Sequence, residues 1–121
     1  MNVLDELIGI ERAAVETEGD TIRVAATLKA RRDSAVYKGH FPGMAVTPGV
    51  CMVGAVVELL AGASGKKLKL QRVVNTKYLS MMTPDDIDGA TLSATLAPDG
   101  TATAAYTKAG TTYAKMKLVI S

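Results

Sequence analysis

The sequence predicts an α+β domain in which an antiparallel sheet curls around one long helix. Two observations support this class. Residues 50–60 are apolar except for Glu58, which favours a helix that is buried rather than amphipathic at a surface. Most of the remaining chain alternates apolar and polar side chains with a period of two, as strands with one buried face do. Because this helix is the only apolar partner of the sheet, we expect the sheet to wrap around it.

The helix has a clear start signal. Thr47 is a good capping residue, and Pro48 suits the first helical position because its missing N–H needs no partner there. We expect the helix to run to about Ala61. It is too short to cross a bilayer, which takes roughly 20 apolar residues, so we expect no membrane insertion.

Turn residues divide the rest of the chain into short segments. Residues 3–7 fit a helical turn, and residues 8–17 fit a first strand. Further strands are predicted at residues 21–29, 68–79, 90–97, 101–108 and 111–120, with a turn at residues 83–86. One helix covers only part of such a sheet. We therefore expect an edge of the sheet to pair with a second subunit, most simply in a homodimer.

Length, charge and cysteine content exclude several classes of protein. A chain of 121 residues fits one domain, residues 1–121, and one cysteine allows no internal disulfide, which fits a reducing compartment. The first twenty residues are acidic and interrupted by charges, unlike a signal peptide, so we expect a cytoplasmic protein. A net charge of +2 without tryptophan argues against nucleic-acid binding. We expect no metal and no cofactor, because no set of ligand residues has metal-binding spacing.

The candidate chemistry lies where a loop carrying the only histidine, His40, leads into the apolar helix. A histidine is mostly neutral near pH 7, because its ordinary pKa is about 6.5, so His40 suits a general base. The free N–H groups at the helix start, near Gly49 and Val50, form a donor site for an oxygen that gains negative charge.

Glu58 is a second candidate. At about 100° per residue it shares a helix face with Cys51 and Gly54. A carboxylate on a buried helix requires a partner, a water-lined cavity or a raised pKa. Glu58 is therefore either a catalytic group or one half of an ion pair with Lys66, Lys67 or an arginine at the subunit interface. We interpret Cys51 as a small buried residue rather than a nucleophile.

A family resemblance rests on two short runs. Residues 39–42 read GHFP, and residues 45–50 read AVTPGV. This combination resembles the motif of the hot-dog-fold 3-hydroxyacyl-acyl-carrier-protein dehydratases, in which a GHFP loop leads through a V-x-PG step into the central helix. The resemblance implies a hot-dog fold, a dimer with sites at the subunit interface, and thioester substrates on an acyl carrier protein or coenzyme A. It also implies elimination of water from a 3-hydroxyacyl thioester to give the 2-enoyl thioester in fatty-acid, polyene or related lipid synthesis.

That elimination needs a base, an acid and a donor that holds the carbonyl oxygen. By resemblance, His40 is the base and Gly49 is the oxyanion donor, with Val50 beside it. The resemblance also places the loop residues Phe41 and Pro42 in the substrate pocket.

The acid is where the sequence departs from the family. The family's usual glutamate, five residues after the glycine of the PG step, is Gly54 here. Gly54 would leave room in the pocket, and one turn further on Glu58 stands where the family commonly has glutamine. Three readings are open: Glu58 supplies the acid, His40 serves as both base and acid, or a related hot-dog subunit supplies the carboxyl in a heterodimer.

Two other classes of function are also open. A hot-dog thioesterase would use Glu58 and water to release a free acid. Release of free thiol from an acyl-coenzyme A would distinguish it from a dehydratase. A non-catalytic subunit would bind an acyl chain or complete a heterodimer, and Gly54 supports that reading. A basic cluster after the helix either meets an acidic carrier protein or favours the helix dipole. Its members are Lys66, Lys67, Lys69 and Arg72.

Overall fold

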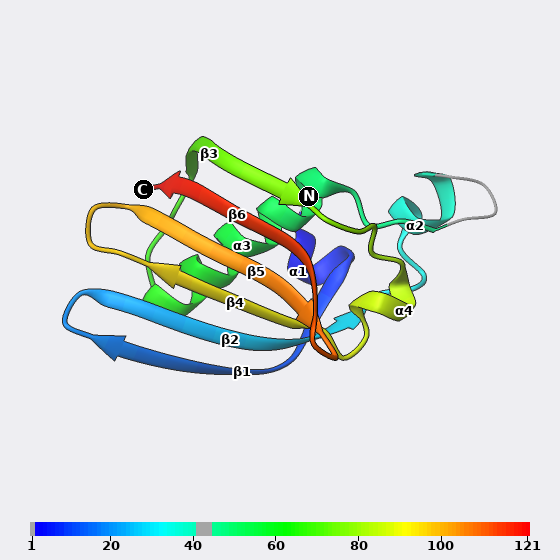
Figure 1. Cartoon of the computed structure of the whole chain (residues 1–121), viewed down its shortest axis with the longest axis horizontal. Coiled ribbons are helices and arrows are strands. Elements are labelled where there is room, and N and C mark those ends of the chain that lie inside the picture. Colours follow the sequence, from blue (N-terminus) through cyan, green and yellow to red (C-terminus); the bar gives the residue numbers. More distant parts are fainter. Residues whose placement is uncertain (1, 41–44) are drawn as a thin grey trace.

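The computed structural model describes residues 2–40 and 45–121, and of His40 only the backbone. In those residues, six strands form one antiparallel sheet that lies over the long helix α3 (Figure 1). The strands follow the order β1-β2-β4-β5-β6-β3. The predicted architecture, a sheet around one long helix, is confirmed.

The elements fall close to their predicted positions. The strands are β1 (Ile8–Glu18), β2 (Thr21–Ala30), β3 (Leu70–Tyr78), β4 (Thr91–Leu96), β5 (Thr101–Lys108) and β6 (Thr111–Ile120). The helices are α1 (Val3–Glu6), α2 (Ala35–His40), α3 (Gly49–Ser64) and α4 (Pro84–Ile87). Strands β5 and β6 coincide with their predictions, and the other strands differ by one or two residues at their ends, where boundaries are least well determined by pattern.

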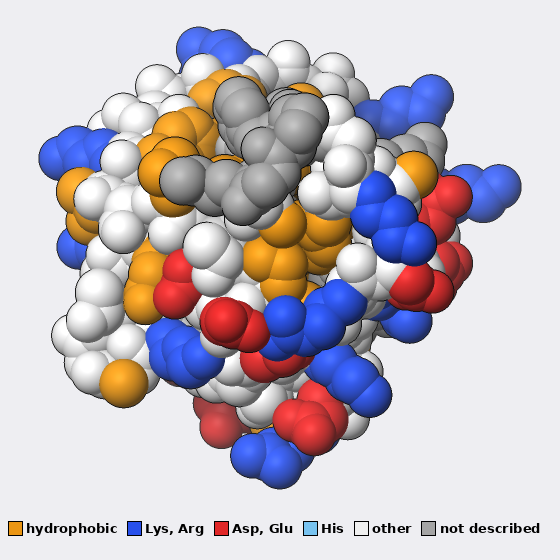
Figure 2. All heavy atoms as spheres, turned by 90° about the vertical axis from the view of Figure 1, so that its right-hand side faces the viewer, with side chains coloured by type: hydrophobic (Ala, Val, Ile, Leu, Met, Phe, Trp, Pro, Cys, Tyr) orange, Lys and Arg blue, Asp and Glu red, His pale blue; other side chains and the backbone are white. Residues whose placement is uncertain are grey.

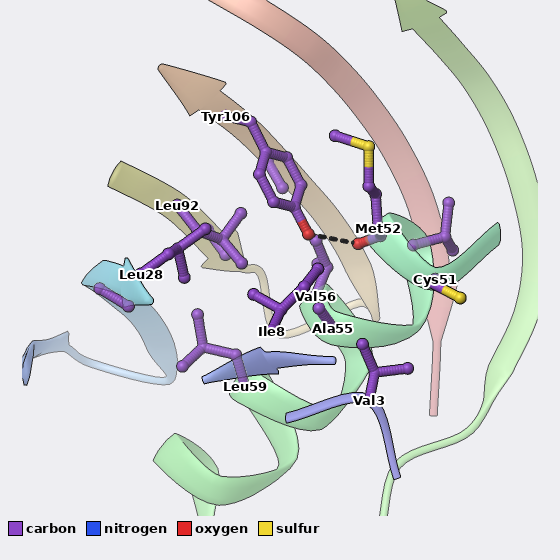
Figure 3. Close-up of a cluster of buried hydrophobic side chains, with 14 of the residues drawn as sticks. Val3, Ile8, Leu28, Cys51, Met52, Ala55, Val56, Leu59, Leu92 and Tyr106 are labelled. Carbon is purple, nitrogen blue, oxygen red and sulfur yellow. Dashed lines mark hydrogen bonds between the residues drawn. The ribbon is translucent and has the colours of Figure 1, made fainter. Parts of the chain in front are cut away.

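The alternating pattern of the strands places one face of the sheet against α3. On β2 the alternate residues Val24, Ala26 and Leu28 are buried, because successive side chains of a strand point to opposite faces. The same alternation holds on β4, β5 and β6. The hydrophobic core therefore lies between this inner face and α3 (Figure 3).

Helix α3 begins one residue later than the sequence predicts. Pro48 is the N-cap and Gly49 is the first helical residue. The expectation that Thr47 caps the helix is wrong, because its hydroxyl forms a hydrogen bond of 2.9 Å with the hydroxyl of Tyr37 instead. A tertiary hydrogen bond thus engages the Thr47 side chain, which the local sequence signal assigns to the helix cap.

The helix ends at Ser64 rather than at the predicted Ala61. Gly62 does not interrupt it, and the chain first turns left-handed at Gly65, with a φ of +70°. Glycine ends helices in this way because it has no Cβ to clash in that conformation. Among the described residues, no helix is both long enough and apolar enough to cross a membrane.

One stripe of α3 is not covered by the sheet. Val50 is 79% exposed, and Gly54, Val57 and Ala61 are partly exposed. These residues share a face because they lie three or four positions apart. The expectation of a helix buried all round is therefore wrong for this stripe, since the sheet covers only the opposite side.

Two short helices lie near the start of α3, and the sequence predicts neither. Residues 83–86, predicted as a turn, open α4 through a capping box between Thr83 and Asp86. Helix α2 places Tyr37 in the core, where it is 3% exposed. Both helices are too short to show a helical period in the sequence.

Tyr106 of β5 joins the sheet to the first turns of α3 (Figure 3). Its ring is buried, and its hydroxyl donates a hydrogen bond of 2.6 Å to the carbonyl oxygen of Met52. Burial raises the pKa of Tyr106 well above its ordinary value, so the hydroxyl remains a donor. This bond fixes where the start of α3 lies on the sheet.

The variant Tyr106→Phe keeps the ring and removes this bond. We expect the free energy of unfolding in urea to fall by about 1 kcal/mol. Tyr113→Phe is the matched control, because the hydroxyl of Tyr113 lies near the surface, 3.3 Å from Asp86, and should contribute less. Equal losses of unfolding free energy in the two variants would show that the buried bond of Tyr106 contributes no more to stability than the bond of Tyr113.

Candidate functional site

A pocket of about 460 Å³ lies at the start of α3. One wall is the first turn of α3 with the residues before it, and the other is the end of β3 with the segment that follows. The lining residues are Val46, Thr47, Pro48, Gly49, Met52, Tyr78, Leu79, Ser80, Met81 and Met82. A concave, mostly apolar lining with a few polar groups suits a small organic ligand.

The pocket contains the helix start that the sequence predicts as a donor site. The N–H groups of Cys51 and Met52 both donate to the carbonyl of Pro48, at 3.0 and 3.1 Å. The N–H groups of Gly49 and Val50 lie before these and outside the helix's own hydrogen-bond ladder. The positive end of the helix dipole adds to their attraction for a developing negative charge.

Tyr78 explains why residue 49 is a glycine. The Tyr78 hydroxyl donates to the carbonyl of Gly49 at 3.1 Å, and a Cβ at position 49 would lie 2.7 Å from the outermost ring carbon of Tyr78. Real side chains essentially never approach so closely, so a larger residue at position 49 would displace the ring. Sequence reasoning misses this pair, because nothing local connects the end of β3 to the start of α3.

His40 is the last residue of α2 rather than a loop residue, and the stretch between α2 and α3 is flanked by a bond between two buried hydroxyls. Tyr37 and Thr47, which are 3% and 4% exposed, share the 2.9 Å hydrogen bond on the two sides of this stretch. Burial also raises the pKa of Tyr37. The N–H of Thr47 donates to the carbonyl of Met82 at 2.8 Å, which ties the end of this stretch to the wall of the pocket.

Glu58 contacts the N-terminal helix. Its two carboxylate oxygens accept the N–H groups of Val3, at 2.8 Å, and Leu4, at 2.9 Å. The carboxylate thereby satisfies two of the donors that the start of α1 leaves free. Glu58 is nine residues beyond Gly49, about 13 Å along the helix axis. These backbone donors stand in place of the ion pair that the sequence offers as one alternative for Glu58.

Gly54 lies beneath Val3. A Cβ at position 54 would be 3.1 Å from Cγ2 of Val3, closer than most real contacts. The absence of a side chain at this position therefore lets α1 rest on α3, where Glu58 can bind it. Val3 therefore occupies the space that a side chain at position 54 would take.

The predicted site residues fall into three groups. At the helix start that borders the pocket are Gly49 and Val50. Against α1 are Gly54 and Glu58. Outside the described residues are the side chain of His40 and the residues Phe41 and Pro42.

Cys51 is buried, as predicted. Its thiol pKa is raised, because burial disfavours the thiolate and the nearby negative charge of Glu58 adds to the effect. A helix start by itself would lower a thiol pKa, so burial outweighs that influence here. The thiol therefore stays protonated and packs as a small apolar group.

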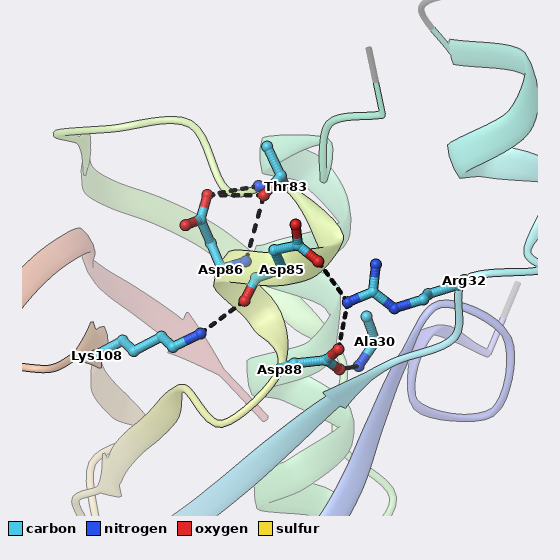
Figure 4. A network of polar contacts seen from close by, with 7 residues as sticks. All are labelled: Ala30, Arg32, Thr83, Asp85, Asp86, Asp88 and Lys108. Atoms are coloured by element: carbon cyan, nitrogen blue, oxygen red, sulfur yellow. Dashed lines mark hydrogen bonds and ion pairs between the residues drawn. The ribbon is translucent and has the colours of Figure 1, made fainter. Parts of the chain in front are cut away.

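A polar network holds α4 against the end of β2 (Figure 4). Arg32 forms ion pairs with Asp85, at 2.7 Å, and with Asp88. Asp88 also accepts the N–H of Ala30 at 2.7 Å, and Lys108 donates to the carbonyl of Asp85 at 2.6 Å. On this side of the molecule, acidic and basic side chains lie interspersed (Figure 2). The network supports the segment that forms one wall of the pocket.

An antiparallel sheet of this order around one long helix is a hot-dog fold, and in the sequence the motif of residues 39–50 leads into that helix. The chain matches the ApeI-like family, described as ApeI dehydratase, over residues 14–117. It therefore belongs to this family, in agreement with the resemblance seen in residues 39–50.

Similar proteins support the same assignment. The 3-hydroxyacyl-[acyl-carrier-protein] dehydratase FabZ of Clostridium acetobutylicum is 36% identical over 59 residues. This match spans 43% of the chain and 42% of the relative, less than half of its length.

Solved structures share the fold. An uncharacterized protein from Erwinia carotovora subsp. atroseptica has a TM-score of 0.72 at 20% identity and covers 95% of this chain and 96% of its own. A chain of the dehydratase heterocomplex ApeI:P from Xenorhabdus doucetiae has a TM-score of 0.68 at 16% identity, covering 93% and 96%.

The hydrogen bond between Tyr37 and Thr47 can be tested with a double-mutant cycle. Tyr37→Phe and Thr47→Val each leave one buried hydroxyl without its partner, and we expect each to lower the free energy of unfolding by about 1–2 kcal/mol. The double variant removes both hydroxyls and should lose less than the sum of the single losses. Strictly additive losses in the free energy of unfolding, measured in urea, would contradict a hydrogen bond between these two hydroxyls.

The carboxylates near α4 predict how stability depends on pH. Hydrogen bonds from the N–H groups of Thr83 and Ala30 lower the pKa values of Asp86 and Asp88 below the ordinary 3.8. Their ionised forms therefore stabilise the fold above the unfolded-state pKa, and this contribution is lost as the pH falls through the lowered native pKa. We expect the melting temperature to decline below about pH 5, and less steeply in Asp88→Asn. If the melting temperature of Asp88→Asn declines with pH as steeply as that of the wild type, Asp88 does not contribute to the pH dependence.

Proposed function

We propose that this chain is a dehydratase-like subunit that eliminates water from a 3-hydroxyacyl chain carried by an acyl carrier protein or coenzyme A. The product is the 2-enoyl thioester of fatty-acid, polyene or related lipid synthesis. The observation that carries the proposal is the free helix start at Gly49 and Val50, in a mostly apolar pocket that the chain reaches a few residues after His40. Membership of a dehydratase family supports it, and the Clostridium relative is named for this reaction.

In this proposal the chain supplies two of the three groups that the elimination needs, the base and the oxyanion donor. His40 accepts the proton from the carbon beside the thioester carbonyl. The N–H groups of Gly49 and Val50 donate to the carbonyl oxygen as it gains negative charge, and they are already oriented before the reaction begins. The apolar lining, which includes Met52 and Met81, accommodates an acyl chain, since methionine adapts to varied shapes.

We assign the acid to a partner subunit. Glu58 is the candidate within the chain, but both its oxygens already accept N–H groups of α1. To donate a proton elsewhere, its carboxyl would have to leave these donors. Gly54, at the family's acid position, has no proton to give. A hot-dog partner with a carboxylate at the equivalent position completes the site, and the Xenorhabdus structure is described as a dehydratase heterocomplex.

A non-catalytic role is the second candidate. Val3 covers Gly54, at the position from which an acid of this family acts, so the chain itself offers no acid there. In that case the chain contributes binding surface while a partner performs the chemistry. A thioesterase would need Glu58 to activate water, and the bonds from Glu58 to α1 do not favour this.

The variant Gly54→Glu tests whether only the acid is missing. Because Val3 would lie against the new side chain, the variant is made together with Val3→Ala, and Val3→Ala alone is the matched control. Loss of one water from a 3-hydroxyacyl carrier thioester is followed by mass spectrometry. We expect little turnover by the wild-type chain or the control, and a rate at least about 10²-fold higher in Val3→Ala/Gly54→Glu. Equal rates would show that the acid position is not what limits the isolated chain.

Two further variants assign the remaining roles. Added to Val3→Ala/Gly54→Glu, His40→Ala should abolish water loss without changing the free energy of unfolding. Unchanged turnover would remove His40 from the mechanism. Glu58→Gln places an amide NH₂ against the N–H groups of α1, so it should lower stability by about 1–2 kcal/mol with little effect on rate. Full turnover by the wild-type chain that is lost in Glu58→Gln would make Glu58 the acid. Release of free thiol would identify a thioesterase.

A further inference from the structure

We infer that the outer face of the sheet carries a second binding site, which takes the diphosphate group of a small organic molecule. The site is a groove over β3, β6, β5 and β4, on the opposite face of the sheet from α3. By chemical class the ligand is a diphosphate ester. The groove shares no lining residue with the pocket at the start of α3, so this site is separate from the proposed dehydration.

The groove has a volume of about 440 Å³, within the range of roughly 300–1,000 Å³ that small-molecule sites occupy. It crosses four strands that lie side by side (Figure 1). On β6, Lys115 and Lys117 stand on either side of the buried Met116. Because successive side chains of a strand point to opposite faces, both lysines point away from the core and into the groove.

Three lysines gather at one end of the groove. Lys77 of β3 lies directly opposite Lys115 of β6, and Lys117 is two residues further along β6. Directly opposite residues have Cα atoms about 5 Å apart, residues two positions apart on a strand about 7 Å, and diagonal neighbours about 7–8 Å. Three positive charges therefore border one small space.

In the part of the chain that the structure describes, no ion pair neutralises these lysines. The strands β3, β4, β5 and β6 contain no Asp or Glu. In the turn before β5, Asp99 accepts the N–H of Thr101 at 2.9 Å, and this bond lowers its pKa more than the charge of Lys117 does. Like charges directly opposite each other, such as Lys77 and Lys115, destabilise a sheet. The fold thus keeps a repulsion that a bound anion would remove.

The rest of the groove is lined by short side chains. Across the sheet, the row of Lys115 continues with Ala105 and Ser93, and the neighbouring row continues with Thr103 and Thr95. These residues leave the space beside the long lysines open. Their hydroxyl groups both donate and accept hydrogen bonds, so they suit the oxygen atoms of a polar ligand.

A diphosphate ester fits this arrangement better than other anions do. Two linked phosphate groups extend across the space between the three lysines, whereas a single phosphate spans less of it. The organic part then lies along the short side chains. Among the described lining residues none is aromatic, so the affinity comes from charge rather than from stacking. A nucleic acid would need cations along a track, and an acidic protein segment carries its charges less densely than a diphosphate.

Binding is measured on the purified chain with ADP as the probe, by isothermal titration calorimetry at low ionic strength without divalent metal. AMP, with one phosphate, and a hexaglutamate peptide are the comparison ligands. The variant Lys77→Gln/Lys115→Gln removes two of the three cations. The matched control is Lys66→Gln/Lys67→Gln, which changes the net charge equally at two exposed lysines outside the groove.

We expect ADP to bind at one site per chain, at least about tenfold more tightly than AMP. Lys77→Gln/Lys115→Gln should weaken ADP binding at least about tenfold, and the control by less than about twofold, because its charges lie further from the ligand. The inference is overturned if AMP binds as tightly as ADP or if the control loses as much affinity. Tighter binding of hexaglutamate than of ADP would also overturn it, in favour of an acidic protein partner.

Thermal unfolding gives a second reading. Without ligand, Lys77→Gln/Lys115→Gln should melt no lower than the wild type, because the substitutions relieve repulsion. ADP should raise the melting temperature of the wild type and leave that of the variant unchanged, since only a bound ligand stabilises the folded state. Equal stabilisation of both chains would contradict the site.

If the variant does not fold, amide resonances of the wild type locate the ligand by NMR. ADP should shift resonances of β5 and β6 and leave those of α3 unchanged, and shifts at α3 instead would overturn the inference. No thioester is present in these measurements. A failure to bind ADP is therefore distinguishable from a failure of dehydration, which is read from water loss alone.

Discussion

The rest of the structure depends on the burial of α3 against the inner face of the sheet. Alternation along β2, β4, β5 and β6 supplies an apolar face, and the helix supplies the matching apolar surface. Each large side chain removed from water contributes roughly 1.5–3 kcal/mol, so this contact dominates the stability of the fold. The bond from Tyr106 to Met52 then sets where the first turns of the helix lie. The pocket is a consequence, because that position brings the helix start next to the end of β3.

Two glycines of α3 serve close packing. Gly49 admits the ring of Tyr78, and Gly54 admits Val3. Both Gly54 and Glu58 hold α1, because Gly54 leaves room for Val3 and Glu58 accepts the N–H groups of Val3 and Leu4.

The surfaces left uncovered follow from the same geometry. One helix is too narrow to cover a sheet of this width, so both the Val50 stripe of α3 and the inner side of β3 stay open. They meet at the pocket, where Tyr78 packs on Gly49. A subunit that covers them would extend the core and border the pocket.

The sequence by itself determined the fold class, the strand pattern and the motif at residues 39–50, because periodicity, turn residues and caps express energies that act between near neighbours in the chain. Tertiary structure decided the rest of the site. In the tertiary structure, the hydroxyl of Thr47 forms a hydrogen bond with Tyr37 instead of capping the helix. The carboxylate of Glu58 accepts the N–H groups of Val3 and Leu4, which are more than fifty residues away in the chain. Such contacts depend on how distant elements pack, and no local pattern records them.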